Sequence, residues 1–237
     1  MNIVLLGHDD YASLWSLNHL LNAAPQHHYS VFVSGALKAG SDTPQSLAEL
    51  AAHDRSLVDT FLEQSDIAES LLQRSELPAP NSDEGLATLT GCEPDLIVSI
   101  RYRRILKDDA IATSRLGVLN LHSGILPDYR GVMATFWAML AGEDEIGTTL
   151  HRITDAGIDA GPVIEINRQP SRLDASYMDN LLSLYGPGCN AMLYAIETLN
   201  DGYEPGVLKR NHGDGAYYST PEQQDLDAFL ARGLKLF

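Results

Sequence analysis

The chain has 237 residues, of which 44% are hydrophobic, which is enough apolar material for a sizeable core in one large domain. Its formal net charge of −16 argues against nucleic-acid binding, since affinity for the phosphate backbone comes mainly from clustered Lys and Arg. The sequence contains no apolar run of about eighteen residues and no basic, cleavable leader, so we expect a cytoplasmic protein with no membrane partner.

Cysteines and basic residues have contrasting distributions. Cys92 and Cys189 stand far apart and in no metal-ligand spacing, so we predict reduced thiols and no bound metal. Five basic residues, in contrast, fall between positions 101 and 115 of this acidic chain. This patch could receive a small anion; the alternative interpretation is a solvated helix start that balances Asp108 and Asp109.

The first half of the chain alternates apolar runs with segments of helical spacing. Two of the apolar runs, PDLIVSI and GVLNLH, are continuous, as is typical of parallel strands covered on both faces. Helical periodicity ends at the break LPAPNSD. We expect strands at 2–7, 29–37, 94–100 and 117–122, and helices at 11–24 and over most of 45–75.

The second half continues this alternation and then changes character. We expect a helix at 132–143, strands at 148–153 and 162–170, and a helix at 176–200 that breaks at Gly186 to Gly188. From Pro205 on, turn residues precede a final amphipathic segment. The pattern predicts an α/β fold, with a doubly wound, mostly parallel sheet flanked by helices. We expect a catalytic domain at 1–204 and a hairpin and helix extension at 205–237.

A pair of polar residues stands out in LNLHSGILPDYRG, residues 119–131. Residues two apart on a strand point to the same face, so Asn120 and His122 should project together from the end of an apolar strand. Ligands of open α/β sheets bind at the carboxyl ends of such strands. The sequence lacks GxGxxG, GxxxxGK[ST], HExxH and GxSxG, so dinucleotide binding, P-loop chemistry, zincin chemistry and serine hydrolysis have no local support.

A second polar element is the loop TDAGIDAGPVI, residues 154–164. If this loop folds over the same sheet edge, Asp159 could orient His122. A histidine held by a carboxylate beside an amide donor is equipped for proton transfer and oxyanion stabilisation, which suits acyl transfer to an amine. The alternatives are a structural histidine at a strand end and a simple Gly/Asp turn.

The segment NLHSGILPDYRG followed by IDAGPVI resembles the catalytic core of the formyltransferases that use 10-formyltetrahydrofolate. That family contains glycinamide ribonucleotide, methionyl-tRNA and amino-sugar formyltransferases. Its pattern is Asn-x-His, a Leu-Pro-x-Tyr/Phe-x-Gly turn and an Asp-x-Gly loop, and every position is filled here. The resemblance spans roughly residues 90 to 200 and implies a formyltransferase-like fold and a one-carbon transferase.

The resemblance also implies roles for individual residues. Asn120 would donate a hydrogen bond to the formyl oxygen as it becomes an oxyanion, and His122 would assist it. Asp159 would hold His122 and accept a proton from the attacking amine, directly or through water. His151 either packs beside the site or contacts ligand. The residues that would line the folate pocket are Arg104, Ile105, Leu106, Thr154, Asp155, Ala156 and Gly157.

The acceptor is expected to be a small-molecule amine. Two aspartates in GHDDYAS would repel a phosphate where glycinamide ribonucleotide enzymes hold one, and the residues after Asn200 are too few for the RNA-binding domain of methionyl-tRNA enzymes. The tail AYYSTPEQQDLDAF resembles the Tyr-rich hairpin of some amino-sugar formyltransferases, so a nucleotide-linked amino sugar comes first and an amino-acid or natural-product amine second. The candidate acceptor-binding residues are His8, Asp9, Asp10, Tyr11 and Arg130.

Several alternatives stay open. The turn at 8–11 could simply cap the first helix. Water could replace the amine, which would make the protein a 10-formyltetrahydrofolate hydrolase, and a glycinamide ribonucleotide formyltransferase is a further enzymatic alternative. A non-enzymatic folate-binding relative is the third, although it would not need all of Asn120, His122 and Asp159. The sequence leaves the oligomeric state open, a homodimer included.

Overall fold

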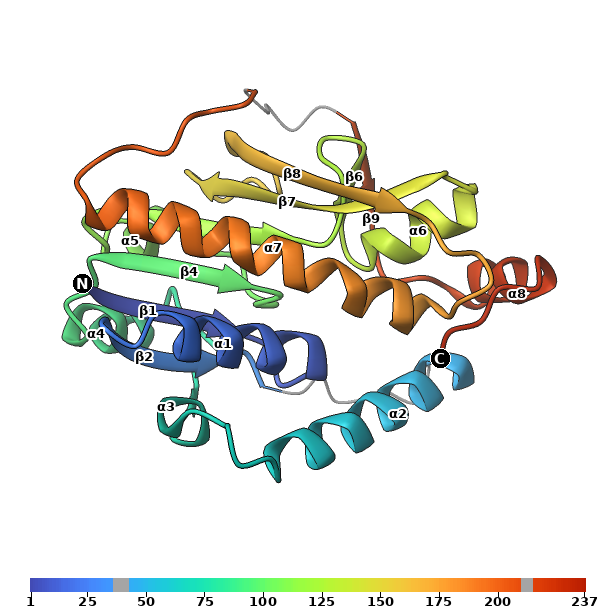
Figure 1. Ribbon diagram of the computed structural model, residues 1–237, viewed down its shortest axis with the longest axis horizontal. Coiled ribbons are helices and arrows are strands. Elements are labelled where there is room, and N and C mark those ends of the chain that lie inside the picture. Colours follow the sequence, from blue (N-terminus) through green and yellow to red (C-terminus); the bar gives the residue numbers. More distant parts are fainter. Residues whose placement is uncertain (36–42, 210–214) are drawn as a thin grey trace.

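The computed structural model describes residues 1–35, 43–209 and 215–237. Its centre is a seven-stranded sheet in the order β3-β2-β1-β4-β5-β7-β8 (Figure 1). The first five of these strands run parallel, whereas β7 and β8 are antiparallel to their neighbours. The strands are β1 (Asn2–Gly7), β2 (His28–Val33), β3 (Ser75–Glu76), β4 (Leu96–Ile100), β5 (Val118–His122), β7 (Glu145–Ile153) and β8 (Val163–Pro170).

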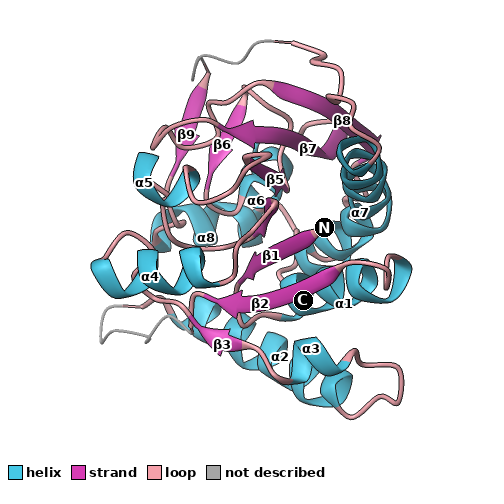
Figure 2. Cartoon of the chain, turned by 90° about the vertical axis from the view of Figure 1, so that its left-hand side faces the viewer, coloured by secondary structure: helices cyan, strands magenta, loops and turns pink. Residues whose placement is uncertain are grey.

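Helices cover both faces of the sheet, which confirms the predicted doubly wound α/β fold (Figure 2). Side chains alternate along β1: Ile3 and Leu5 join a core with α1 and α7, whereas Val4 and Leu6 pack with α4 and the segment around α5. Among the described residues no helix is long and apolar enough to cross a membrane. The helices are α1 (Tyr11–Ala23), α2 (Gln45–Leu62), α3 (Glu69–Leu72), α4 (Asp83–Gly91), α5 (Asp108–Ile111), α6 (Ala134–Ala141), α7 (Tyr177–Asn200) and α8 (Gln223–Ala231).

Helix α7 is continuous, so the predicted break at Gly186 to Gly188 is wrong. Pro187 lies inside the helix and removes one backbone hydrogen bond there. The buried face of the helix, with Tyr185 and Cys189, packs into the main core and outweighs that local cost. Gly188 lets the helix approach the sheet closely, because a Cβ there would lie 2.9 Å from Thr148 Oγ1.

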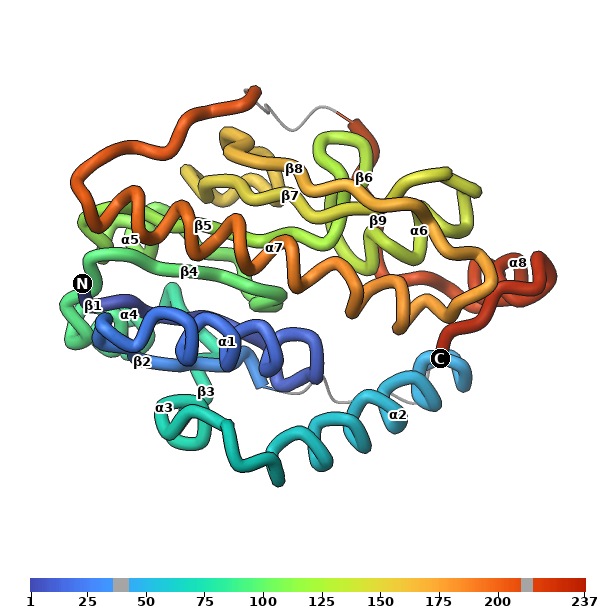
Figure 3. The backbone as a smooth tube through the Cα atoms, viewed as in Figure 1, coloured from blue at the N-terminus to red at the C-terminus, as the bar shows by residue number. Residues whose placement is uncertain are grey.

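The C-terminal segment packs against the rest of the chain (Figure 3). Its strand β9 (Ala216–Tyr218) pairs in parallel with β6 (Tyr129–Gly131), which directly follows the Asn-x-His strand. This pairing joins the extension to a distant part of the chain. Phe229 of α8 stacks on Phe136 of α6 at a ring-centroid distance of 4.5 Å, so the extension shares the main core.

Candidate active site

Strand β5 brings Asn120 and His122 to the carboxyl edge of the sheet, as the alternation predicts. It lies between β4 and β7, and its register with β7 places Asn120 directly opposite His151. The Asn120 Nδ2 and His151 Nε2 atoms are 2.9 Å apart. The His151 Nδ1 atom lies 3.0 Å from the Arg152 carbonyl oxygen. These two contacts hold the His151 ring against the Asn120 amide on one side and the backbone on the other.

Asp159 lies between the two histidines. Its Oδ2 atom is 3.5 Å from His122 Nδ1, and its Oδ1 atom is 3.5 Å from His151 Nε2. The backbone N–H of Gly131 donates to Oδ2 at 2.8 Å. Asp159 has a φ of 49°, the left-handed region that non-glycine residues rarely adopt, and such residues cluster at functional sites. The structure thus brings Asn120, His122 and Asp159 together, with His151 as a fourth member.

Asp159 is ionised in this setting. Burial alone would raise the pKa of its carboxyl, but His122, His151 and the Gly131 N–H together hold that pKa well below its usual range. His122 has oxygen acceptors at both ring nitrogens: Nε2 lies 2.7 Å from the Tyr129 carbonyl oxygen, and Nδ1 faces Asp159. The site can therefore stabilise a positive charge on His122.

A cavity of about 390 Å³ opens onto this cluster. Asn120, His122, His151 and Asp159 lie in its wall. Six of the seven residues predicted for the folate pocket also line it, and Thr154 does not. These six are Arg104, Ile105, Leu106, Asp155, Ala156 and Gly157.

Arg130 ties two walls of the cavity together. Its Nε donates to the Ile158 carbonyl at 3.0 Å, which links strand β6 to the loop that carries Asp159. Arg130 does not line the cavity. The same strand pairs with β9, and Tyr217 and Thr220 of the C-terminal extension complete the cavity wall. The sequence had signalled this part only through its resemblance to a Tyr-rich tail.

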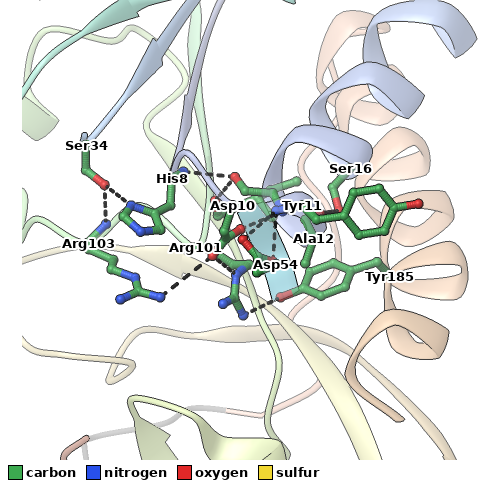
Figure 4. Close-up of polar contacts among 12 residues, drawn as sticks. His8, Asp10, Tyr11, Ala12, Ser16, Ser34, Asp54, Arg101, Arg103 and Tyr185 are labelled. Carbon is green, nitrogen blue, oxygen red and sulfur yellow. Dashed lines mark hydrogen bonds and ion pairs between the residues drawn. The ribbon is translucent and has the colours of Figure 1, made fainter. Parts of the chain in front are cut away.

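The turn at His8 to Tyr11 does not line the cavity. His8 and Asp10 lie next to Arg101 and Arg103, which do line it (Figure 4). Asp10 is the N-cap of α1 and accepts from the Ser13 N–H at 2.9 Å, as the capping alternative stated, but the residue is buried. The Tyr11 N–H donates to Asp54 Oδ1 at 3.2 Å. Burial lowers the pKa of His8 to about 4, and Arg103 adds to this, so its imidazole is neutral near pH 7.

Both aspartates of this turn already have cationic partners. Asp9 pairs with Arg55 and Arg74, each at 3.1 Å. Asp10 pairs with Arg101 at 2.8 Å, and Arg101 lines the cavity. The premise that two uncompensated aspartates would repel a phosphate is therefore wrong. The sequence could not show this, because Arg55 and Arg74 are distant along the chain.

Comparison with known proteins identifies one family. The family model described as "Formyl transferase" matches residues 32–171. A methionyl-tRNA formyltransferase from Desulfotalea psychrophila is 36% identical over 124 residues, which cover 51% of this chain and 37% of that protein. The matched region thus spans little more than a third of that curated relative.

Solved structures share the fold at low sequence identity. A sugar N-formyltransferase from Shewanella sp. superposes with a TM-score of 0.62 and 14% identity, covering 96% of this chain and 86% of that one. An N-formyltransferase from Helicobacter canadensis, solved with folinic acid and dTDP-3-aminofucose, gives a TM-score of 0.58 and 22% identity, covering 95% and 72%. At these identities the match concerns the fold.

Proposed function

The chain belongs to the formyl transferase family, and from this premise we propose that it moves a formyl group from 10-formyltetrahydrofolate to the amine of a small molecule. The observation that carries the proposal is the convergence of Asn120, His122 and Asp159 on one cavity. A binding protein without chemistry would not need an ionised buried carboxylate between two histidines.

Asn120, His122 and Asp159 have different roles in the proposed acyl transfer. The Asn120 amide is the donor for the formyl oxygen as negative charge develops there. The amine nitrogen forms a bond to the formyl carbon, the bond from that carbon to the folate nitrogen breaks, and the proton lost by the amine is passed on to the leaving nitrogen. His122 assists oxyanion stabilisation and this proton movement, and Asp159 holds its ring in place. Since the pKa of Asp159 is held low, we assign it charge stabilisation and orientation rather than the role of final base.

The cavity suits a folate donor, whose contribution is the activated formyl group. Its volume of about 390 Å³ falls within the range of small-molecule sites. Ile105 and Leu106 on one side and residues 155–157 on the other would hold the flat ring system, with Arg104 beside them. Relatives of the same fold are described with folinic acid and with 5-N-formyl-THF, which supports this assignment.

For the acceptor we propose a nucleotide-linked amino sugar, with an amino-acid or other natural-product amine as the next class. The Helicobacter canadensis protein is described in complex with dTDP-3-aminofucose, and it shares this fold over nearly the whole chain. We further propose that residues 205–237 serve the active site directly, since Tyr217 and Thr220 line its cavity.

The experiment that tests this function is a spectroscopic assay of tetrahydrofolate release from 10-formyltetrahydrofolate. The panel holds amino-sugar nucleotides, amino acids, glycinamide ribonucleotide and methionyl-tRNA, with a reaction that lacks any amine. We expect release that depends on one class of amine and disappears in His122→Ala but persists in His28→Ala, a histidine at the exposed start of β2. Release without an amine would instead identify a hydrolase, and no release with any amine would contradict the proposal.

A further inference from the structure

One wall of the cavity carries a surplus of positive charge. Arg101, Arg103 and Arg104 all line the cavity. Among the described residues Asp10 is the single carboxylate within ion-pair distance of any of them, and it pairs with Arg101 and Arg103 but not with Arg104. The protein as a whole has a net charge of −16, so this local excess of cations is the opposite of its general character.

Two of the three arginines have their donors engaged by the protein. Arg101 follows β4 in the left-handed region, at φ 58°, and its Nε donates to Asp10 at 2.8 Å. Its NH1 group lies 3.3 Å from the Tyr185 hydroxyl. Arg104 donates to three backbone carbonyls, those of Ser34, Pro78 and Arg103. These contacts fix the course of the chain along the cavity.

Arg103 differs from both neighbours. Its nearest carboxylate oxygen is Asp10 Oδ2 at 3.7 Å, which is beyond hydrogen-bond distance, and Arg101 already holds that oxygen (Figure 4). Its side chain is 34% exposed and lines the cavity. Burial, together with the neighbouring Arg101, lowers the pKa of the Arg103 guanidinium. An additional anion would stabilise the Arg103 guanidinium, because Arg103 shares the Asp10 carboxylate with Arg101.

The position of Arg103 indicates which ligand would bring that anion. Parallel strands β1 and β4 are neighbours, and the chain leaves β1 toward β2 on one side and returns to β4 on the other, so their carboxyl ends form the switch point of the sheet. Arg103 lies there, beside the His8 to Tyr11 turn, through its N–H contact with Ser34 Oγ and the His8 contact with the same oxygen. Arg104 to Leu106 continue into the wall assigned to the folate ring.

We propose that Arg103 is the anchor for an anionic group, a phosphate or carboxylate, carried by the amine acceptor. The proposal rests on the proposed function and narrows it: neutral amines are poor substrates, and amines that also bear a phosphate or carboxylate are good ones. The planar guanidinium can donate two parallel hydrogen bonds to either group. The nearby Asp10 and Arg101 keep the segment in place while Arg103 remains available to ligand.

The first test measures binding without turnover, with inorganic pyrophosphate as the probe. Thermal unfolding is followed as pyrophosphate is added at constant ionic strength. Since a ligand that binds the folded state alone stabilises it, we expect a saturable rise in Tm of about 2–4 °C for the wild type. Arg103→Met should abolish the rise. Arg115→Met, which removes an exposed arginine of the same basic patch outside the cavity, should retain it.

Arg103→Lys is a second variant that keeps the test decisive if Arg103→Met does not fold. A point charge in place of the planar fork should weaken pyrophosphate binding about three- to tenfold while preserving the fold. The anchor is refuted if the wild type shows no saturable rise, if Arg103→Met keeps the whole rise, or if Arg103→Lys binds pyrophosphate as tightly as the wild type. Because no turnover is involved, these outcomes are independent of whether formyl transfer occurs.

A second arm distinguishes the acceptor from the folate as the source of the anion, because the glutamate tail of a folate also carries carboxylates. The Kd of 5-formyltetrahydrofolate is measured by calorimetry for the wild type and Arg103→Met. We expect the two values to agree, while the KM of the acceptor found in the panel rises about tenfold or more in the variant. A weaker folate complex with an unchanged acceptor KM would overturn the assignment to the acceptor.

Discussion

Two buried aspartates at the carboxyl edge of the sheet have similar surroundings and different chemistry. The side chains of Asp159 and Asp10 are 11% and 8% exposed, so burial does not distinguish them. Each lies between two basic side chains: His122 and His151 for Asp159, Arg101 and Arg103 for Asp10. Histidine can gain or lose a proton near neutral pH, whereas arginine stays charged.

The partners therefore decide what each carboxylate can do. The Asp159 cluster can take part in proton transfer, since histidine is a side chain suited to general acid–base catalysis. The Asp10 cluster is a fixed ion pair that holds the chain after β4 and caps α1. We expect changes in the first cluster to reduce catalysis with little loss of stability, and changes in the second to reduce stability first.

The largest effect is expected from Asp159→Asn. This change keeps the shape of the side chain but removes the charge that stabilises protonated His122. We expect kcat to fall about 1,000-fold, which corresponds to about 4 kcal/mol, with a KM for folate within a factor of three of the wild type. The measurement is steady-state release of tetrahydrofolate.

The control for this prediction is Asp155→Asn, which alters an exposed aspartate of the same loop. It also lines the cavity but does not contact either histidine in the ion pairs described here. We expect Asp155→Asn to keep kcat within about tenfold of the wild type. Equal losses of kcat in the two variants would show that loop geometry, and not the Asp159 charge, carries the effect.

The second prediction concerns Asp10. Asp10→Ala leaves Arg101 buried without a counter-charge and removes the N-cap of α1, so we expect the free energy of unfolding to fall by about 3 kcal/mol. Asn is a good N-cap but carries no charge, so Asp10→Asn should lose about 2 kcal/mol. Urea unfolding gives both values. Identical losses in the two variants would mean that the ion pair alone, without the cap, accounts for the stabilisation.

The same contrast explains which features the sequence could predict. Strands β1, β4 and β5 are continuous apolar runs, and their burial on both faces follows from that composition. Asn120 and His122 could be placed on one face because strand periodicity is local. Asp159 could be proposed only on the condition that its loop folds over the same sheet edge, and the resemblance to a known family supported that condition, since no local rule places a loop residue against a strand that lies 37 positions earlier.

Long-range partners account for most of what the sequence could not show. Arg55 and Arg74 neutralise Asp9 from α2 and from the segment after α3, and no local pattern marks them as its partners. The pairing of β6 with β9 joins short strands about 85 residues apart, neither of which has a recognisable strand pattern. The continuity of α7 depends on its packing against the sheet, which outweighs Pro187.

A smaller effect is expected from His151→Leu. This substitution removes the imidazole that fixes the Asn120 amide, so the amide can turn away from the formyl oxygen. A misplaced group of this kind costs up to about 100-fold in kcat, and the acceptor KM should change little. The control is His19→Leu on α1, where the ring stacks on Trp15 outside the cavity. A raised KM with unchanged kcat would assign His151 to ligand binding instead of to positioning Asn120.

The smallest effect sharpens the comparison, because it concerns Asp54, a carboxyl next to the Asp10 cluster whose pKa is raised to about 6. Burial raises the pKa of Asp54 to about 6, and Asp10 adds to the rise. The folded carboxyl therefore binds its proton more tightly than the unfolded one, which titrates near 3.8, so the free energy of unfolding falls as pH rises from about 4 to 6. Asp54→Asn should remove this loss, raising the free energy of unfolding at pH 8 by about 1 kcal/mol after allowance for partial exposure, with no gain at pH 4.

Denaturant unfolding at both pH values measures this gain, with Asp59→Asn on the exposed side of α2 as the control. A gain of the same size at pH 4 and pH 8 would mean that Asp54 costs stability for a reason other than its charge.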